Sequence, residues 1–262
     1  MLGMKMKTNE VQAIGTFLCD YATTLLESGA TTVRIEKNVW RMAESYGFEA
    51  EVNIYPRHVD VVQRDQETGS TAIFSKTIKG SANNYATITE LSKLSWNCYD
   101  HHLSLEVCQR EYQRIIHTPR LSNTLVTILT SFANLSFCRL FGGDLISMII
   151  VFVATLCGFY AKGALHRKWG VDMRVATIVA GCISAIMSCS GYVFGWGTTP
   201  DVALATSVLY LVPGIPYLNS VSDLINGHNI CATSRFLQAM IITVCLSVGL
   251  YLGLWLMNIG IL

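Results

Sequence analysis

The segment LVPGIPYLNSVSDLINGH, Leu211 to His228, places two prolines, a glycine and an aspartate within or just beyond an otherwise apolar run. Proline removes a backbone donor and interrupts the helix around it. In hydrocarbon, such an interruption is tolerated only where the chain is buried in protein or lines a wet cavity. A carboxylate there is costly and suggests a functional role. The segment therefore predicts that something polar crosses a membrane or docks within it.

Charged residues are unevenly distributed along the 262 residues of the chain. They make up 14% of the sequence, against about 25% in an average soluble domain. Residues 1–120 contain 13 of the 19 Lys and Arg residues and 14 of the 18 acidic residues. We therefore expect a soluble domain over residues 1–120 and a membrane domain over residues 121–262. The net charge of +1, without a basic patch, argues against nucleic acid as a partner.

The nine cysteines show no spacing typical of a metal site or a disulfide framework. Several lie in apolar runs, where cysteine behaves as a small hydrophobic residue. We expect no bound metal and no cofactor. The polar N-terminus lacks the early apolar core of a signal peptide.

Residues 1–120 predict an α+β domain with the order ααβββαα. Apolar residues recur at helical spacing over Val11–Gly29. Thr31 or Thr32 is expected to cap a second helix that ends at Gly47, with Trp40 among its buried positions. Three strands and two further helices complete the domain; they are expected at Glu49–Tyr55, His58–Gln63, Ser70–Ile78, Ile88–Tyr99 and Ser104–His117, with a hairpin loop at Asp65–Gly69.

The most suggestive patch of this domain is Ser28, Gly29 and Ala30 with Arg34 and Glu36. One interpretation is a small polar site at a junction between two helices. The other is an ordinary helix end followed by a pair of surface charges, which are common and weak. No nucleophile with its base, phosphate loop or pair of carboxylates stands out, so we do not expect an enzyme.

Five uncharged runs predict five transmembrane helices after this domain. Each is close to the roughly 20 residues that cross about 30 Å of hydrocarbon. The runs are Leu121–Cys138, Leu145–Ala161, Val175–Pro200, Val202–Ser222 and Phe236–Leu262.

Basic residues predict the orientation of these helices. Lys162, Arg167, Lys168 and Arg174 lie between the second and third runs, whereas the loop after the third run contains no Lys or Arg. The positive-inside rule then places residues 1–120 in the cytoplasm and the C-terminus outside.

The strongest candidates for a substrate or ion pathway lie in the segment quoted first. Pro213, Gly214 and Pro216 would interrupt the fourth crossing and expose backbone groups that can bind ions or carboxylates. Asp223 shares a helical face with Asn219 and could carry a proton. The alternative for Asp223 is an ordinary charge at a cytoplasmic helix end.

Three other acidic residues lie in the membrane half. Asp144 follows two glycines and is expected to cap the second crossing, although it could also line an outer vestibule. Asp172 is expected to be a loop charge, and Asp201 is expected to cap the fourth crossing.

Two pairs of glycines have the GxxxG spacing that lets helices approach closely in lipid. They are Gly191 with Gly195 and Gly249 with Gly253. Together with the odd number of crossings, they suggest a partner within the membrane.

Two motifs resemble those of a known family, the threonine/serine exporter superfamily, and specifically its YjjP-like N-terminal half. The first is P-G-x-P-x-x-N-x-x-x-D-L-x-x-G, from Pro213 to Gly227, and the second is S-G-A-x-x-x-R-x-E, from Ser28 to Glu36. The resemblance covers nearly the whole chain. It implies that the second motif is functional as well as structural.

The resemblance also implies an activity and a partner. Members export small polar solutes, threonine and serine or dicarboxylates such as succinate, and are thought to draw on the proton gradient. Because the second membrane block of full-length members is missing here, the resemblance implies a hetero-oligomer with a YjjB-like membrane subunit. The alternative is a membrane-anchored sensor whose cytoplasmic domain binds a metabolite.

Overall fold

The computed structural model describes residues 2–65, 69–78, 80, 83–119 and 121–258. The chain divides into two compact units, each with buried apolar clusters of its own. The first unit combines Met1–Pro119 with Tyr217–Phe236, and the second combines Arg120–Pro216 with Leu237–Leu262. The boundary expected near residue 120 thus accounts for one segment of the first unit, and a later segment joins it.

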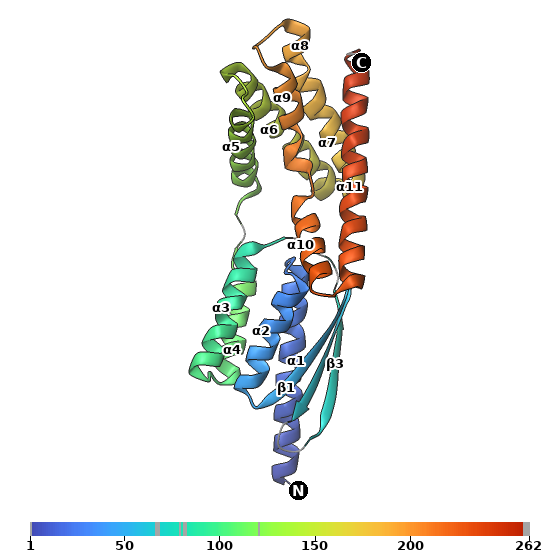
Figure 1. Ribbon diagram of the computed structural model, residues 1–262. Helices are drawn as coiled ribbons and strands as arrows, with labels where there is room; N and C mark the ends of the chain where they lie inside the picture. Colours follow the sequence, from blue (N-terminus) through green and yellow to red (C-terminus); the bar gives the residue numbers. More distant parts are fainter. Residues whose placement is uncertain (1, 66–68, 79, 81–82, 120, 259–262) are drawn as a thin grey trace. The chain divides into compact units, whose positions relative to one another are not determined.

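The described residues of the first unit form four complete helices, one three-stranded sheet and parts of two later helices (Figure 1). In chain order these are α1 (Leu2–Glu27), α2 (Thr32–Ser45), β1 (Phe48–Tyr55), β2 (His58–Asp65), β3 (Thr71–Thr77), α3 (Tyr85–His101), α4 (Leu105–Ile116), most of α10 (Gly214–Ile225) and the start of α11 (Asn229–Leu256).

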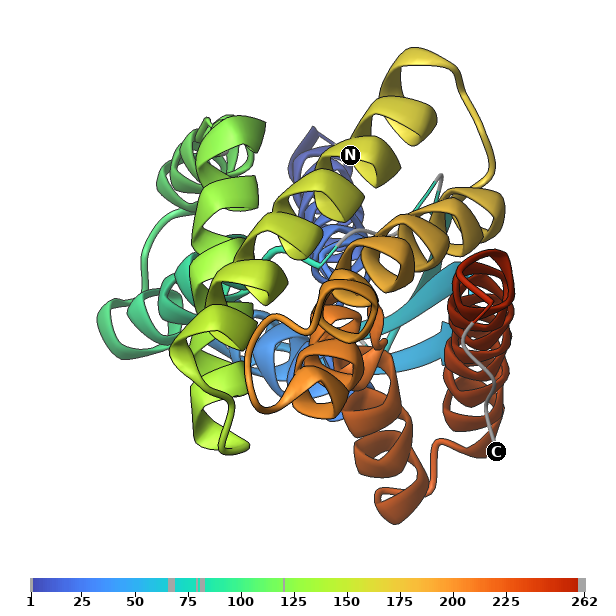
Figure 2. The same cartoon turned by 90° about the horizontal axis from the view of Figure 1, so that it is seen from above.

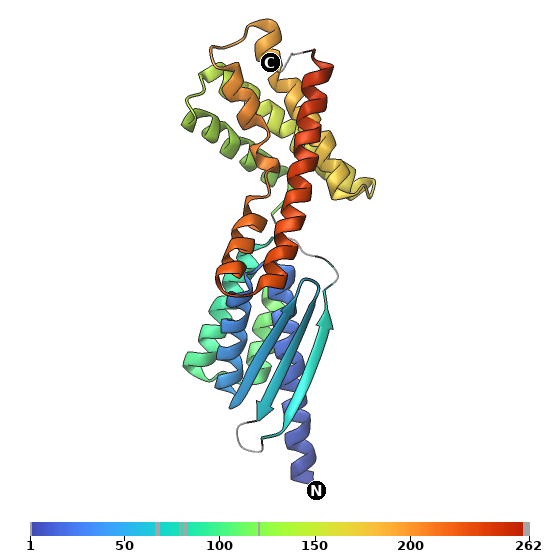
Figure 3. The same cartoon turned by 45° about the vertical axis from the view of Figure 1, so that its right-hand side comes forward.

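The core of the first unit forms where α1 packs against the sheet and against α2. The strands are antiparallel in the order β1-β2-β3, with Tyr55 opposite His58 at the first turn. Figure 3 shows the sheet beside α1. Leu18, Tyr21 and Leu25 of α1 are fully buried, as their helical spacing indicates. Residues 66–68 of the expected hairpin loop lie outside the described residues.

The prediction that Trp40 of α2 is buried is wrong. Trp40 is 49% exposed, with its ring 6.0 Å from that of Tyr99. The buried stripe of α2 runs through Ile35, Val39 and Met42 instead. The ring of Trp40 points away from this stripe, because each residue turns about 100° around a helix.

The second unit is a bundle of helices. Its described elements are α5 (Asn123–Leu140), α6 (Leu145–Lys168), α7 (Met173–Ser188), α8 (Ser190–Phe194), α9 (Pro200–Ser207), the 3-10 turn η1 (Leu209–Leu211) and the greater part of α11. Within this bundle α6 packs against both α5 and α7, and α9 packs against all three (Figure 2). The short helix α9 is therefore surrounded by longer ones.

The expectation of five crossings is not confirmed. Among the described residues, three segments are long and apolar enough to cross a membrane: Leu145–Lys168, Met173–Phe194 and Asn229–Leu256. A fourth crossing results if Pro200–Leu211 and Gly214–Ile225 are counted together as one broken span. Helix α5 does not qualify, because Asn123, Asn134 and Arg139 lower the hydropathy of its 18 residues.

The two GxxxG pairs have different roles from those expected. Gly195 ends α8 with a φ of +65°, so Gly191 and Gly195 do not form a stripe on one continuous helix. Gly249 and Gly253 of α11 face α7 within the second unit. A Cβ on Gly253 would lie 2.8 Å from the carbonyl oxygen of Cys182, and one on Gly249 would overlap that of Ile178. This pair therefore packs within the chain and supplies no evidence for a partner.

Gly249→Val is expected to destabilise the second unit by about 1–3 kcal/mol, since a branched side chain would force α7 and α11 apart. The measurement is thermal unfolding of the full chain in detergent. Gly214→Ala is the matched control, because no atom lies within 4 Å of the added Cβ and the backbone suits any residue. Equal unfolding temperatures for the two variants would contradict the close approach of α7 and α11.

Candidate functional site

The site in the first unit is built on the short loop between α1 and α2. Helix α1 ends at Glu27, and Gly29 takes a φ of +84°, which suits glycine. The amide of Ala30 returns to the carbonyl of Leu25 at 3.0 Å. This turn leaves the carbonyl oxygens of Gly29 and Ala30 free of the helix and available to other donors.

Two side chains from the C-terminal segment of the unit donate to these carbonyls. The amide of Asn219, on α10, donates to the Gly29 oxygen at 2.9 Å. The guanidinium of Arg235, on α11, donates to the Ala30 oxygen at 2.8 Å. The loop is thereby fixed to residues 190 and 205 positions later in the chain.

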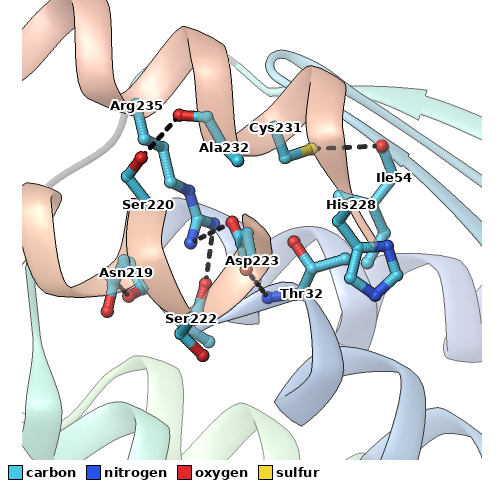
Figure 4. A network of polar contacts seen from close by, with 12 residues as sticks. Thr32, Ile54, Asn219, Ser220, Ser222, Asp223, His228, Cys231, Ala232 and Arg235 are labelled. Carbon is cyan, nitrogen blue, oxygen red and sulfur yellow. Dashed lines mark hydrogen bonds and ion pairs between the residues drawn. The ribbon is translucent and has the colours of Figure 1, made fainter. Parts of the chain in front are cut away.

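Asp223 caps the N-terminus of α2 from a distant part of the sequence. Its Oδ1 accepts a hydrogen bond from the backbone amide of Thr32 at 3.1 Å, whereas the side chain of the N-cap residue Thr31 makes no capping bond (Figure 4). A carboxylate at this end of a helix is stabilised by unpaired amides and by the helix dipole. The expected capping threonine is thus replaced by an aspartate that adjoins α2 through tertiary packing.

Asp223 also forms an ion pair with Arg235. The Asp223 Oδ2 and Arg235 Nη1 atoms are 3.0 Å apart, in contact as charges rather than as a linear hydrogen bond. The Asp223 side chain is fully buried and that of Arg235 is 17% exposed. We call Asn219, Asp223 and Arg235, with the backbone of residues 29–32, the Asp223 cluster.

The two charged residues of the second motif, Glu36 and Arg34, lie in different surroundings. Glu36 faces His228, with 3.3 Å between Glu36 Oε2 and His228 Nε2. Burial raises the pKa of Glu36, and the neighbouring His228 offsets part of this rise. Arg34 is exposed and, among the described residues, pairs with no carboxylate. Ser28 is buried, and its carbonyl oxygen accepts the amide of Asn84 at 2.9 Å.

This site also includes Arg235, Thr32 and His228, which were not predicted as members of it. Arg235 and His228 are isolated polar residues near the start of a long apolar helix, which is the signal that could have identified them. Thr32 contributes only its backbone amide, so no side-chain pattern could reveal it.

A second cluster of polar side chains lies in the interior of the second unit, beside the interruption between α9 and α10. Helix α9 ends at Ser207, and Val212 and Pro213 separate η1 from α10. The buried amide of Asn134, on α5, donates to the carbonyl oxygen of Thr206 at 3.1 Å and to the hydroxyl of Thr155 at 2.8 Å. Asn134 therefore binds backbone at the end of a broken helix, which helices in lipid require.

Hydroxyl groups extend this polar interior toward α7. The hydroxyl oxygens of Ser184 and Tyr210 are 2.9 Å apart, and the Tyr210 hydroxyl lies against Gly158, where a side chain would displace it. Further buried polar residues of the unit are Thr127, Ser131, Ser147, Thr177 and Ser188. The polar groups named here are uncharged, so this interior can hydrogen-bond a solute without a fixed counter-charge.

Asp144 caps α6, as one of its two interpretations predicted. Its carboxylate accepts the amide of Ser147 at 2.8 Å and that of Thr198 at 2.6 Å. The same oxygens lie close to the hydroxyl of Thr199. Asp144 therefore also holds the loop that leads into α9. Asp172 caps α7 in a similar way, and Asp201 lies exposed in the first turn of α9.

The described residues form several apolar helices, a broken helix with bound backbone groups and a buried polar interior. Together these features define a polytopic membrane protein. The ThrE family, described as "Putative threonine/serine exporter", matches residues 16–257. The chain belongs to this family, and the resemblance noted from its two motifs is confirmed.

Curated relatives of the chain are also described as transporters or exporters. Over 252 residues the chain is 22% identical to the "Probable succinate transporter subunit YjjP" of Escherichia coli, covering 95% of this chain and 96% of that protein. A protein of the same description from Klebsiella aerogenes is 23% identical, with coverage of 96% and 98%. The "Probable threonine/serine exporter" of Mycobacterium tuberculosis is 19% identical over 89% of this chain but only 44% of its own length. No solved structure matches the chain.

Proposed function

We propose that the chain is one subunit of a secondary exporter of small carboxylate-bearing solutes, either threonine and serine or dicarboxylates such as succinate. The exporter would lie in a bacterial inner membrane and act with a YjjB-like membrane subunit. The proposal is consistent with the relatives described as a succinate transporter subunit and with the partial coverage of the longer relative.

One observation carries this proposal: the interrupted helix of the second unit with its carbonyl groups held by Asn134. A break in a crossing exposes backbone dipoles, and secondary transporters use the dipoles of broken helices to bind solutes and ions. The uncharged hydroxyls and amides around the break suit a solute that brings its own charge.

The orientation is also part of the proposal. The last turn of α6 contains His166, Arg167 and Lys168, which favour the cytoplasmic side. With α5 counted as a fifth crossing, residues 1–119 would lie in the cytoplasm and the C-terminus outside. The segment Tyr217–Phe236 would then also be cytoplasmic, since it folds with the first unit.

The site residues named from the sequence take two roles in this proposal. Pro213, Gly214 and Pro216 interrupt the crossing that forms the passage, and Asp144 holds its outer loop. Asn219 links the segment after the break to the loop between α1 and α2, and Asp223 links it to α2 itself. Protonation of Asp223 would remove its charge and weaken its contact with Arg235, which would couple a proton to the loosening of this link.

Transport assays test the proposal directly. Cells or vesicles that contain the chain and its YjjB-like partner should export labelled succinate or threonine, whereas either chain alone should not. Collapse of the proton gradient should reduce the initial rate at least tenfold if a proton is coupled. Absence of export for both solutes in a correctly inserted complex would contradict the proposal and favour the membrane-anchored sensor.

A further inference from the structure

A hollow of about 590 Å³ lies within the first unit, between α2, α3 and α10. Four cationic side chains line it, Arg34, Lys37, Arg41 and Lys93, and no acidic residue of the described chain does. Lys93 is paired with Glu90 at 2.7 Å, so three of the four cations have no carboxylate partner among the described residues. We call this site the basic hollow. Because like charges gathered on one surface destabilise each other in the absence of a counter-ion, its composition favours an anion.

Arg41 is held in place by neutral groups. Its Nη1 donates to the Asn38 side-chain oxygen at 2.7 Å, and its guanidinium carbon lies 3.9 Å from the ring centroid of Trp96. Asn38 is 2% exposed and is itself fixed by donating to Ser92 at 3.0 Å. The guanidinium is thus pre-positioned without a carboxylate partner, which reduces the entropy cost of binding an anion.

One side of α2 carries Arg34, Lys37 and Arg41, because Lys37 follows Arg34 by three residues and Arg41 follows it by seven. Among the described residues, neither Arg34 nor Lys37 pairs with a carboxylate. Seven residues of helix extend about 10 Å, so the cations form a row rather than a point. A row of charges matches a short solute with a carboxylate at each end better than a compact anion or a zwitterion.

We propose that the basic hollow binds a small linear dicarboxylate, with Arg41 as the fixed contact and Arg34 and Lys37 as the adjustable ones. This inference names the solute class and rests on the proposed export function. Ser222 of α10 and Asn226, just after the end of this helix, also line the hollow. A bound solute therefore contacts the same helix that carries Asp223, which places binding beside the link between α10 and α2.

Binding is measured on the full chain in nanodiscs of neutral lipid, without the partner subunit, by calorimetry with succinate. Arg34→Gln/Lys37→Gln should weaken binding at least tenfold, because two charge-assisted contacts are lost. Arg57→Gln/Arg64→Gln is the matched control: it removes the same charge from exposed positions of the first unit outside the hollow, and binding should change less than twofold. Binding should also weaken as salt increases.

Other anions test whether the basic hollow is selective for a dicarboxylate or attracts any anion. Threonine and inorganic phosphate should bind at least tenfold more weakly than succinate. Equal affinity for phosphate, competition by anionic lipid alone, or the same loss in both double variants would overturn the assignment. Because this assay needs neither flux nor the partner, succinate binding without export would contradict the proposed function and leave the hollow intact as a site.

Discussion

Asp223→Asn is expected to destabilise the first turn of α2 by about 3 kcal/mol and to abolish export. The substitution retains an oxygen that can accept from the Thr32 amide, so it removes charge with little change of shape. It leaves the guanidinium of Arg235, only 17% exposed, without its carboxylate. Loss of one partner from a buried ion pair typically costs about 3–5 kcal/mol.

Hydrogen exchange of the full chain measures this effect locally, since the opening of α2 need not involve global unfolding. Protection of the first turn of α2 should fall in Asp223→Asn. In Asp223→Asn/Arg235→Gln both charges are gone, and protection should return to within about 1 kcal/mol of the native value. Asp201→Asn serves as the control, because Asp201 is an exposed residue at another helix N-terminus.

Transport by the same variants separates two roles of Asp223. If it only holds α10 to α2, the double variant should recover export together with its stability. If Asp223 also carries the coupling proton, the double variant should be stable and inactive, which is the result we expect. Unchanged protection of α2 in Asp223→Asn would show that the ion pair with Arg235 does not stabilise this end of the helix.

Asn134→Leu is expected to reduce export at least tenfold and to lower the stability of the second unit by about 2–4 kcal/mol. Leucine has a similar size but no donor for the carbonyl of Thr206 or the hydroxyl of Thr155. A backbone carbonyl without a partner in a membrane interior costs several kcal/mol. The end of α9 should therefore shift, and the polar interior beside the break should change shape.

Efflux from cells with both subunits and thermal unfolding of the purified chain check this prediction. Ser136→Ala is the matched control on the same helix, since its exposed hydroxyl bonds only to the carbonyl of Phe132 in its own helix. It should leave both measurements unchanged. Export at the native rate by Asn134→Leu would remove this polar interior from the solute pathway.

Local periodicity predicted most of the secondary structure of the first unit. The apolar positions of α1 are buried as their spacing indicates, and three strands occur close to where alternation and turn residues placed them. Trp40 was misplaced because a single large apolar residue can lie on the exposed side of a helix whose buried stripe is already complete. The prediction of five crossings is not confirmed, because the polar residues of α5 keep its mean hydropathy below that of the three qualifying segments.

The candidate sites were less predictable than the fold. The two motifs around Gly29 and Asp223 were singled out separately, and nothing in their spacing indicated that they contact each other. Asn134 was missed because one amide within an apolar run has no periodic signal. The paired glycines at 249 and 253 were detected, but whether they face another chain or α7 depends on packing.

By itself, the sequence determined the order of the helices and strands in the first unit and the break beside Pro213, because proline, glycine and apolar spacing act through the local backbone. Only the tertiary structure decided the partners of Asp223: the Thr32 amide, 191 residues earlier, and Arg235, twelve residues later. Such partners are set by how folded elements pack, since a side chain contacts whatever lies beside it in space and not along the chain.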